Sequence, residues 1–203
     1  MPNVMILEPL TASFIASLLG EIADKTQLII LGFALKYKAP WKVFFGGLAG
    51  HAMMDGVAIM LGFYFGTLFL GEWIKWVVGI LFILLGAWTL AKPYLKKPKK
   101  EEKDVVKKIK SSAPFAVTFL AVLFTEIGDK TQIATGLLGA EFSASYIGPL
   151  MVFIGATLGL ALTIGLNVFV GSKLAERLPK KAIKITTAVL FILFGVFTLF
   201  FKS

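Results

Sequence analysis

Six long stretches of apolar residues follow one another along the chain, separated by shorter polar segments. They cover residues 9–35, 43–70, 73–91, 114–139, 146–171 and 182–201. Each is close to or longer than the about 20 residues that an α-helix needs to cross the hydrocarbon core of a bilayer. Since a helix satisfies its backbone hydrogen bonds internally, the pattern predicts an all-α, polytopic membrane protein with six transmembrane helices.

The composition agrees with this prediction and excludes several other classes of protein. Hydrophobic residues make up 57% of the 203 residues and charged residues only 16%, whereas about 25% of a soluble domain is charged. The chain has no cysteine, which excludes disulfides, thiolate catalysis and sulfur-rich metal sites. Its single histidine excludes a zinc or copper site built from several imidazoles.

Positive charge is concentrated in three of the segments between the apolar stretches, at 36–42, 92–113 and 172–184. These segments hold 17 of the 21 Lys and Arg residues, and all three lie on the same side of a six-helix arrangement. Because cytoplasmic loops carry an excess of Lys and Arg, this side is expected in the cytoplasm, with both termini outside. The inner membrane of a bacterial cell is the expected location. Membrane orientation, rather than a nucleic-acid partner, then explains the net charge of +9.

The chain contains an internal duplication. The segment EIADKTQ at Glu21–Gln27 recurs as EIGDKTQ at Glu126–Gln132, an offset of 105 residues. Further on, Leu81–Leu90 matches Leu190–Leu199 at seven of ten positions, with an offset of 109. Matching blocks in the same order indicate a repeated unit rather than a chance likeness between apolar segments.

The duplication sets the expected domain organisation. It predicts a first three-helix repeat at 1–91, a Lys-rich cytoplasmic linker at 92–113 and a second three-helix repeat at 114–203. In the second and fifth apolar stretches, the offset of 105 pairs Gly50 with Gly155. Because three is an odd number of helices, the second repeat enters the membrane from the opposite side. Inverted repeats of this kind are typical of secondary transporters, whose substrate sites lie near the bilayer midplane.

Four acidic residues stand near the middle of the first and fourth apolar stretches. An ionised side chain at this depth is costly unless it faces a partner, a cavity or a bound ion. The three-residue spacing within each motif predicts that both acids share one helix face, and inverted symmetry is expected to bring the two faces together. The predicted metal ligands are Glu21, Asp24, Glu126 and Asp129, together with Thr26, Thr131, Gln27 and Gln132.

These side chains offer an oxygen-rich ligand set. It suits Ca²⁺ or Mn²⁺ better than the tightly hydrated Mg²⁺, and it is poorly suited to Cu⁺ or Zn²⁺. Four ionised carboxylates together with Lys25 and Lys130 leave a net charge of −2, which one divalent cation or two protons would neutralise. The hypothesis is therefore divalent cation/proton antiport, in which the metal is the transported ion and no cofactor is needed.

The doubled motif resembles the E-x-G-D-K-T motif of the membrane family of Golgi-type calcium/manganese transporters and their bacterial manganese-exporting relatives. The resemblance extends over the whole chain, with its six apolar stretches, two repeats and charged central loop. It implies exchange of Mn²⁺ or Ca²⁺ for protons, with the four motif acids as the cation site. The first copy departs from the motif because Ala23 stands where the second copy has Gly128.

Two further polar features lie inside apolar stretches. His51 and Asp55 stand four residues apart, and the offset of 105 places Ala156 and Leu160 at the equivalent positions. Two interpretations stay open: a proton relay or accessory ligand, and a local hydrogen-bonded pair. Asn167 is expected to make an interhelical hydrogen bond, although its oxygen is also a candidate ligand.

Other functions are compatible with parts of the pattern. Glu21–Lys25 and Glu126–Lys130 can be interpreted as ion pairs that lock the helices of a non-transporting scaffold. A metal-dependent intramembrane enzyme is disfavoured because the sequence shows no nucleophile–base pair and no phosphate-binding loop, so the protein is expected not to be an enzyme. An exporter of basic amino acids is a rival within the transporters. The expected partners are the bilayer, a divalent metal ion and protons, and a homo-oligomer stays open.

Overall fold

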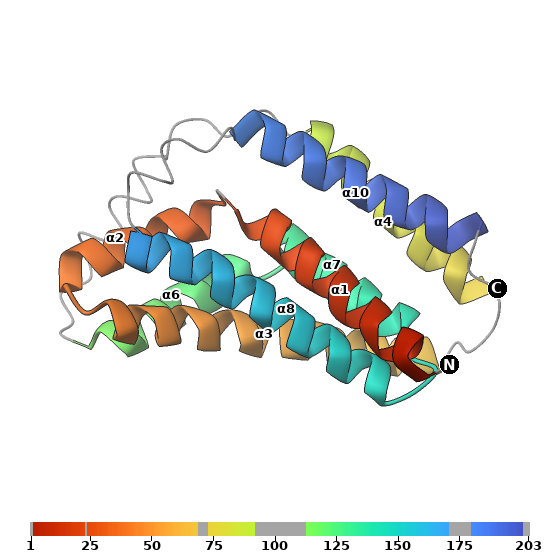
Figure 1. Ribbon diagram of the computed structural model, residues 1–203, viewed down its shortest axis with the longest axis horizontal. Helices are drawn as coiled ribbons and strands as arrows, with labels where there is room; N and C mark the ends of the chain where they lie inside the picture. The colour runs from red at the N-terminus through yellow and green to blue at the C-terminus, as the bar shows by residue number, and fades with distance from the viewer. Residues whose placement is uncertain (1, 23, 69–72, 92–112, 171–179, 201–203) are drawn as a thin grey trace.

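The computed structural model describes residues 2–22, 24–68, 73–91, 113–170 and 180–200, and the predicted all-α class is confirmed within these ranges (Figure 1). The chain forms eight α-helices there and one short π-helix, η1. Their bounds are α1 (Pro2–Glu21), α2 (Lys25–Tyr37), α3 (Pro40–Leu68), α4 (Trp73–Ala91), α6 (Pro114–Glu126), α7 (Lys130–Glu141), α8 (Ile147–Gly165), η1 (Leu166–Val170) and α10 (Lys180–Phe200). The two larger Lys-rich segments, 92–113 and 172–184, lie mostly outside the described residues, at 92–112 and 172–179.

Two described helices are long and apolar enough to cross a membrane by length and composition. They are α3 and the helix that continues from α8 to Phe169. The pair α1 and α2 counts as a third span if its two pieces are taken together, although they are bent by 69°. Shorter apolar helices, at Trp76–Ala91, Pro114–Glu126 and Ile185–Phe200, lie within the other three predicted stretches.

The structure corrects the expectation of a continuous helix through each acidic motif. Helix α1 ends at Glu21 and α2 begins at Lys25, while α6 ends at Glu126 and α7 begins at Lys130. The acids of one motif therefore do not share a single helix face. Broken backbone at membrane depth is tolerated where it is buried in protein or lines a cavity, and discontinuous helices of this kind form the ion sites of many transporters.

The aspartate of each motif explains why the helix stops. The backbone N–H of Asp24 donates to the Glu21 carbonyl at 3.1 Å, and that of Asp129 donates to the Glu126 carbonyl at 3.0 Å. Each aspartate side chain is then the N-cap of the next helix and accepts from the backbone N–H two residues later at 3.5 Å. An aspartate that binds a downstream amide favours a new helix start over continuation. In the second copy Gly128 also has φ +70°, a left-handed conformation that glycine adopts without strain.

Equivalent glycines bring helices from the two parts of the chain into close contact. A methyl group built at Gly46 or Gly50 on α3 would run into the α6 backbone, at the carbonyls of Phe115 and Phe119. On α8 a methyl group at Gly155 or Gly159 would run into the α1 backbone, at the carbonyls of Leu10 and Phe14. The α1–α8 and α6–α3 contacts are thus equivalent.

This equivalence corrects the alignment of the second and fifth stretches. Gly46 corresponds to Gly155 and Gly50 to Gly159, an offset of 109 rather than 105. The equivalent of His51 is therefore Leu160. Several glycines in each stretch allow more than one alignment, and the packing selects the one that agrees with the offset of 109 in the later repeat block.

Most of the packing joins helices before residue 92 to helices after residue 112. The principal contacts are α1 with α8, α4 with α10, and α3 with α6, α7 and α8. Helices α4 and α10 lie side by side at the edge of the bundle (Figure 1), where the ring of Phe82 packs against Phe191 and Phe194.

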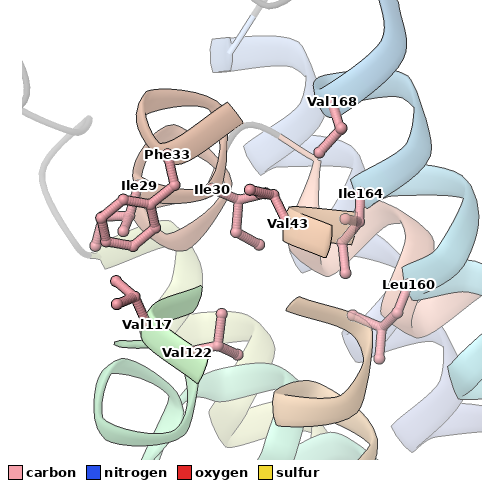
Figure 2. Close-up of a cluster of buried hydrophobic side chains, with 9 residues drawn as sticks. All are labelled: Ile29, Ile30, Phe33, Val43, Val117, Val122, Leu160, Ile164 and Val168. Carbon is pink, nitrogen blue, oxygen red and sulfur yellow. The ribbon is translucent and has the colours of Figure 1, made fainter. Parts of the chain in front are cut away.

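Two apolar clusters flank a polar layer. The first, shown in Figure 2, joins side chains of α2, α3, α6, α8 and η1, including Val43 on α3. The second joins α3, α4, α7, α8 and α10, and includes Ile59 further along α3. Between these two positions α3 carries His51 and Asp55, both buried. The polar layer where the functional groups meet is therefore held between two hydrophobic clusters.

Candidate metal centre

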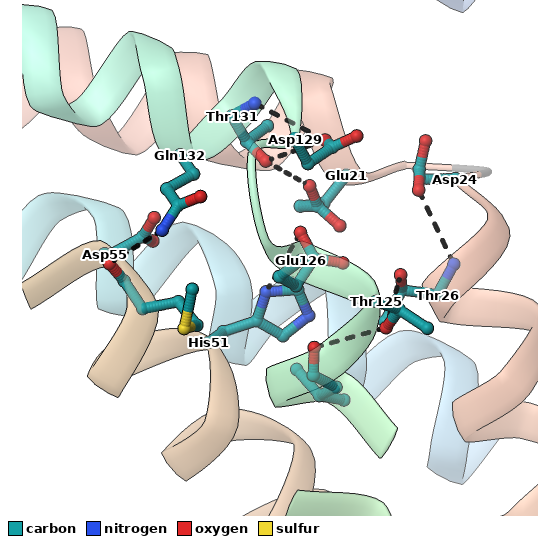
Figure 3. A network of polar contacts seen from close by, with 12 residues as sticks. Glu21, Asp24, Thr26, His51, Asp55, Thr125, Glu126, Asp129, Thr131 and Gln132 are labelled. Carbon is teal, nitrogen blue, oxygen red and sulfur yellow. Dashed lines mark hydrogen bonds and ion pairs between the residues drawn. The ribbon is translucent and has the colours of Figure 1, made fainter. Parts of the chain in front are cut away.

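Two glutamates and a histidine meet where the motif helices break (Figure 3). Glu21 is the last residue of α1 and Glu126 the last residue of α6, while His51 comes from the middle of α3. Each of the three offers a ligand atom, and these atoms all lie within 4.8 Å of one another. The exposed fractions are 0% for Glu21, 2% for Glu126 and 3% for His51, so all three side chains are buried inside the protein.

One polar atom of each of these side chains has no hydrogen-bond partner among the described residues. These atoms are Oε2 of Glu21, Oε1 of Glu126 and Nε2 of His51. Burying a polar group without a hydrogen bond costs free energy, and such groups are rare in folded proteins. Each of the three side chains that meet here therefore keeps one buried atom available to a cation.

The threonine of each motif reaches the glutamate of the other motif. Thr131 Oγ1 donates to Glu21 Oε1 at 2.6 Å and also lies 3.3 Å from Asp129 Oδ2. The side chain of Thr26 is in turn a hydrogen-bond partner of Glu126, and its hydroxyl lies 3.4 Å from that of Thr125. The two motifs therefore hold each other's carboxylates in place.

The two aspartates lie beside the glutamate pair and are joined by a lysine. Lys130 Nζ lies 2.9 Å from Asp24 Oδ1 and 3.5 Å from Asp129 Oδ2. Lys130 therefore bridges one aspartate from each motif, instead of making the Glu126–Lys130 pair of the scaffold hypothesis. The side chain of Lys25 lies outside the described residues.

Both predicted glutamine ligands use their side-chain oxygens in hydrogen bonds. Asn167 Nδ2 donates to Gln27 Oε1 at 2.8 Å, which is the interhelical bond expected of Asn167. The backbone N–H of Gly128 donates to Gln132 Oε1 at 2.6 Å, and Gln132 Nε2 donates to the Met54 carbonyl at 3.4 Å. The glutamines therefore tie the helix breaks to neighbouring helices.

Asp55 takes a different place from the one that its spacing to His51 suggests. Its Oδ1 accepts from Thr135 Oγ1 on α7 at 3.0 Å, whereas His51 Nδ1 lies 3.9 Å from Glu126 Oε2. His51 is thus the group that joins the motif acids, although it is absent from the predicted ligand set. The one signal for it in the sequence is that the only histidine stands in the middle of an apolar stretch.

A buried carboxylate centre at two broken helices, in a duplicated helical protein, is typical of a secondary transporter. Comparison with known families gives the same class. The family described as "Divalent cation/proton antiporter GDT1" matches residues 9–97 and 114–203. The chain therefore belongs to the GDT1 family of divalent cation/proton antiporters, and the match in two segments shows that the family domain is doubled. It is a multi-pass membrane transporter and not an enzyme.

Full-length relatives come from bacteria and plants. The chain is 32% identical to a Vibrio cholerae protein named "Putative manganese exporter", over 98% of this chain and 94% of the relative. It is 28% identical to GDT1-like protein 5 of rice, over 94% of each chain. It is also 28% identical to the GDT1-like protein sll0615 of Synechocystis, over 94% of this chain and 96% of the relative. No solved structure matches the chain.

Proposed function

We propose that the protein exchanges Mn²⁺ for protons and that Glu21 and Glu126 bind both ions in turn. The observation that carries this proposal is the pair of buried glutamates, one from each motif, whose ligand atoms lie within 4.8 Å of each other and of His51, and which each keep one oxygen without a hydrogen-bond partner among the described residues. The family supplies the reaction class. The name of the Vibrio cholerae relative favours manganese as the metal.

The proposed topology is six transmembrane helices in two inverted three-helix repeats, 1–91 and 114–203, joined by the cytoplasmic linker 92–113. Both termini would lie outside the inner membrane. The equivalent α1–α8 and α6–α3 contacts and the match of the family in two segments support the repeats. The concentration of Lys and Arg in three segments supports the orientation.

The charges of the proposed site explain why metal and protons exclude each other. Two ionised glutamates carry −2, which one Mn²⁺ or two protons neutralise. Either load therefore removes the charge of the glutamate pair before the buried site opens to the other side of the membrane. Glu21 and Glu126 also terminate helices, and the backbone carbonyls at a helix C-terminus favour a cation.

The remaining predicted ligands are proposed to shape the site around these glutamates. Asp24 and Asp129 start the second half-helices and hold Lys130 between them. Thr26 and Thr131 orient the glutamates. Gln27 and Gln132 fix the breaks to neighbouring helices through the hydrogen bonds described above. In this proposal they act through the position of the glutamates, and the aspartates add negative charge near the ion.

The test is transport by purified protein in liposomes that contain a pH-sensitive dye. A pulse of Mn²⁺ should change the internal pH as metal and protons exchange, while Na⁺ should not. A pulse of lysine tests the rival exporter of basic amino acids. Glu21→Gln and Glu126→Gln should abolish the Mn²⁺ response. Glu8→Gln, which changes an acid elsewhere on α1, serves as the matched control. Normal exchange by either glutamate variant would remove that residue from the site.

A further inference from the structure

His51 has no counterpart in the second repeat. Its equivalent in the other half is Leu160, a buried apolar residue. The two glutamates therefore come as a symmetric pair, whereas the imidazole is present once. A difference between the halves at the centre of the site points to a property that symmetry alone does not supply.

The surroundings of His51 do not provide what a structural histidine needs. Its Nε2 has no hydrogen-bond partner among the described residues, and Nδ1 lies 3.9 Å from Glu126 Oε2, too far for a hydrogen bond. The side chain is 3% exposed, so bulk water does not compensate. A buried imidazole in this position is costly, and a bound cation would supply the missing interaction.

The geometry points to His51 as the third ligand of the transported ion and as the residue that selects transition-metal ions over Ca²⁺ and Mg²⁺. This inference rests on the proposed function, in which Glu21 and Glu126 bind the ion. Divalent ions lie about 2.0–2.6 Å from their ligand atoms, so two ligands of one ion are at most about 5 Å apart. The atoms of Glu21, His51 and Glu126 meet this condition, since they lie within 4.8 Å of one another.

Ligand chemistry gives the direction of the selectivity. Ca²⁺ and Mg²⁺ are bound almost entirely by oxygen, whereas first-row transition metals also bind imidazole nitrogen, with Mn²⁺ at the weak end of that series. Two carboxylates alone would bind Ca²⁺ and Mn²⁺ with little distinction. Adding one buried nitrogen strengthens the binding of Mn²⁺, and it leaves Ca²⁺ with one oxygen ligand fewer than an all-oxygen site would give.

A direct test is pulsed electron paramagnetic resonance of Mn²⁺ bound to the full chain, purified without a histidine tag. Because the chain has one histidine, a ¹⁴N coupling typical of a coordinated imidazole is assigned to His51. We expect this coupling in the unmodified protein and its loss in His51→Gln, which places an oxygen near the position of Nε2. Bound Mn²⁺ without the coupling would overturn the inference.

A transport test measures the selectivity itself. In both His51→Gln and His51→Asn an amide oxygen takes the place of an imidazole nitrogen, so Ca²⁺ should compete better with Mn²⁺. The Ca²⁺ concentration that halves Mn²⁺ exchange should therefore fall at least about tenfold in each variant. Asp55→Asn is the matched control, because it changes a buried polar residue one turn along α3 and should leave the ratio of Mn²⁺ to Ca²⁺ unchanged. Unchanged selectivity in both His51 variants would overturn the inference.

The two proposals fail in different ways. If Glu21→Gln and Glu126→Gln bind Mn²⁺ as tightly as the unmodified protein does, the proposed site is wrong, whatever His51 does. If those variants bind Mn²⁺ much more weakly while the His51 variants keep both the selectivity and the spectrum of the unmodified protein, only the role of His51 is wrong. A His51 variant that does not fold is recognised by its melting curve. The nitrogen coupling in the unmodified protein then decides the question alone.

Discussion

The two copies of the acidic motif have almost the same sequence and break their helices at equivalent residues, but their neighbours differ. In both, a glutamate ends one helix, an aspartate caps the next, and the capping aspartate has φ −73° with ψ of 164° or 161°. Beyond this shared frame the copies differ. Gln27 accepts from Asn167, whereas Gln132 accepts from the backbone of its own motif. Lys130 of the second copy bridges both aspartates.

The comparison separates two kinds of requirement. What both copies share, namely a helix break and a buried glutamate, is what binding and neutralising a divalent ion demands. The groups that differ are Asn167, which hydrogen-bonds to Gln27, and His51, which lies beside the glutamates, and each of them is present in one half only. In the proposed mechanism the symmetric frame supplies the charge, and His51, which is present once, selects the ion.

The largest effect is expected from the glutamates, and it should be equal in the two copies. Glu21→Gln and Glu126→Gln should each lower Mn²⁺-driven proton flux by at least about 100-fold, because each removes a charged ligand. Flux in liposomes, normalised to the amount of folded protein, measures the effect. A large loss in only one variant would contradict the symmetric role proposed for the pair.

The pH dependence of binding should reveal the number of acids that the metal displaces. Where both glutamates of the metal-free site are protonated, raising the pH by one unit should lower the Kd for Mn²⁺ by about 100-fold, because two protons are released. The dependence should level off once both glutamates are ionised. Glu21→Gln or Glu126→Gln should reduce the slope to about tenfold. Free Mn²⁺, measured by electron paramagnetic resonance, gives the Kd. Equal slopes in all three proteins would contradict the proposal that both glutamates release a proton when Mn²⁺ binds.

The lysine bridge between the two motifs provides a third test. Lys130→Gln leaves two aspartates close together without their cation, so it should lower the free energy of unfolding by about 2 kcal/mol. The melting temperature in detergent measures this, with Lys42→Gln on the exposed start of α3 as the matched control. Adding Asp24→Asn to Lys130→Gln should recover part of the loss, and no recovery would show that the bridge is not the cause.

The smallest effect is expected from the motif threonines. Thr131→Val removes a 2.6 Å hydrogen bond to Glu21 and should weaken Mn²⁺ binding by about 1.5 kcal/mol, or roughly tenfold. Thr26→Val is the matched variant in the other copy and should cost a similar amount through Glu126. Titration with Mn²⁺ measures the change in Kd for each variant. A change in only one variant would show that the two threonines do not play equivalent roles.

Much of the fold can be predicted from the sequence because it depends on bulk properties. Apolar stretches of membrane length indicate helices whatever their neighbours, and a seven-residue motif with a near-identical copy indicates a duplication. The breaks at Asp24 and Asp129 are harder to predict, since no proline interrupts either motif and the surrounding residues are apolar. The capping ability of aspartate is the only local signal in the first copy, while Gly128 adds a second signal in the other.

The site could be predicted only in part for a related reason. The glutamates are evident because a charge inside an apolar stretch demands a function. The position of His51 beside them depends on how α3 packs across the two helix breaks. The spacing of residues within one helix does not predict that packing. The alignment with an offset of 105 also paired His51 with Ala156 instead of Leu160, because glycines recur often enough in both stretches to match in more than one register.

The interlocked arrangement of helices has a consequence for biosynthesis. Helices α1, α3 and α4 find their main packing surfaces on α8, α6, α7 and α10, which the ribosome produces later. The first part of the nascent chain thus enters the bilayer before the helices that contact its glycines and bury its glutamate have been made. Tertiary assembly must therefore follow completion of the last helix. By the same logic, two separately translated fragments divided within 92–112 carry complementary surfaces and should reassemble when they are produced in the same cell.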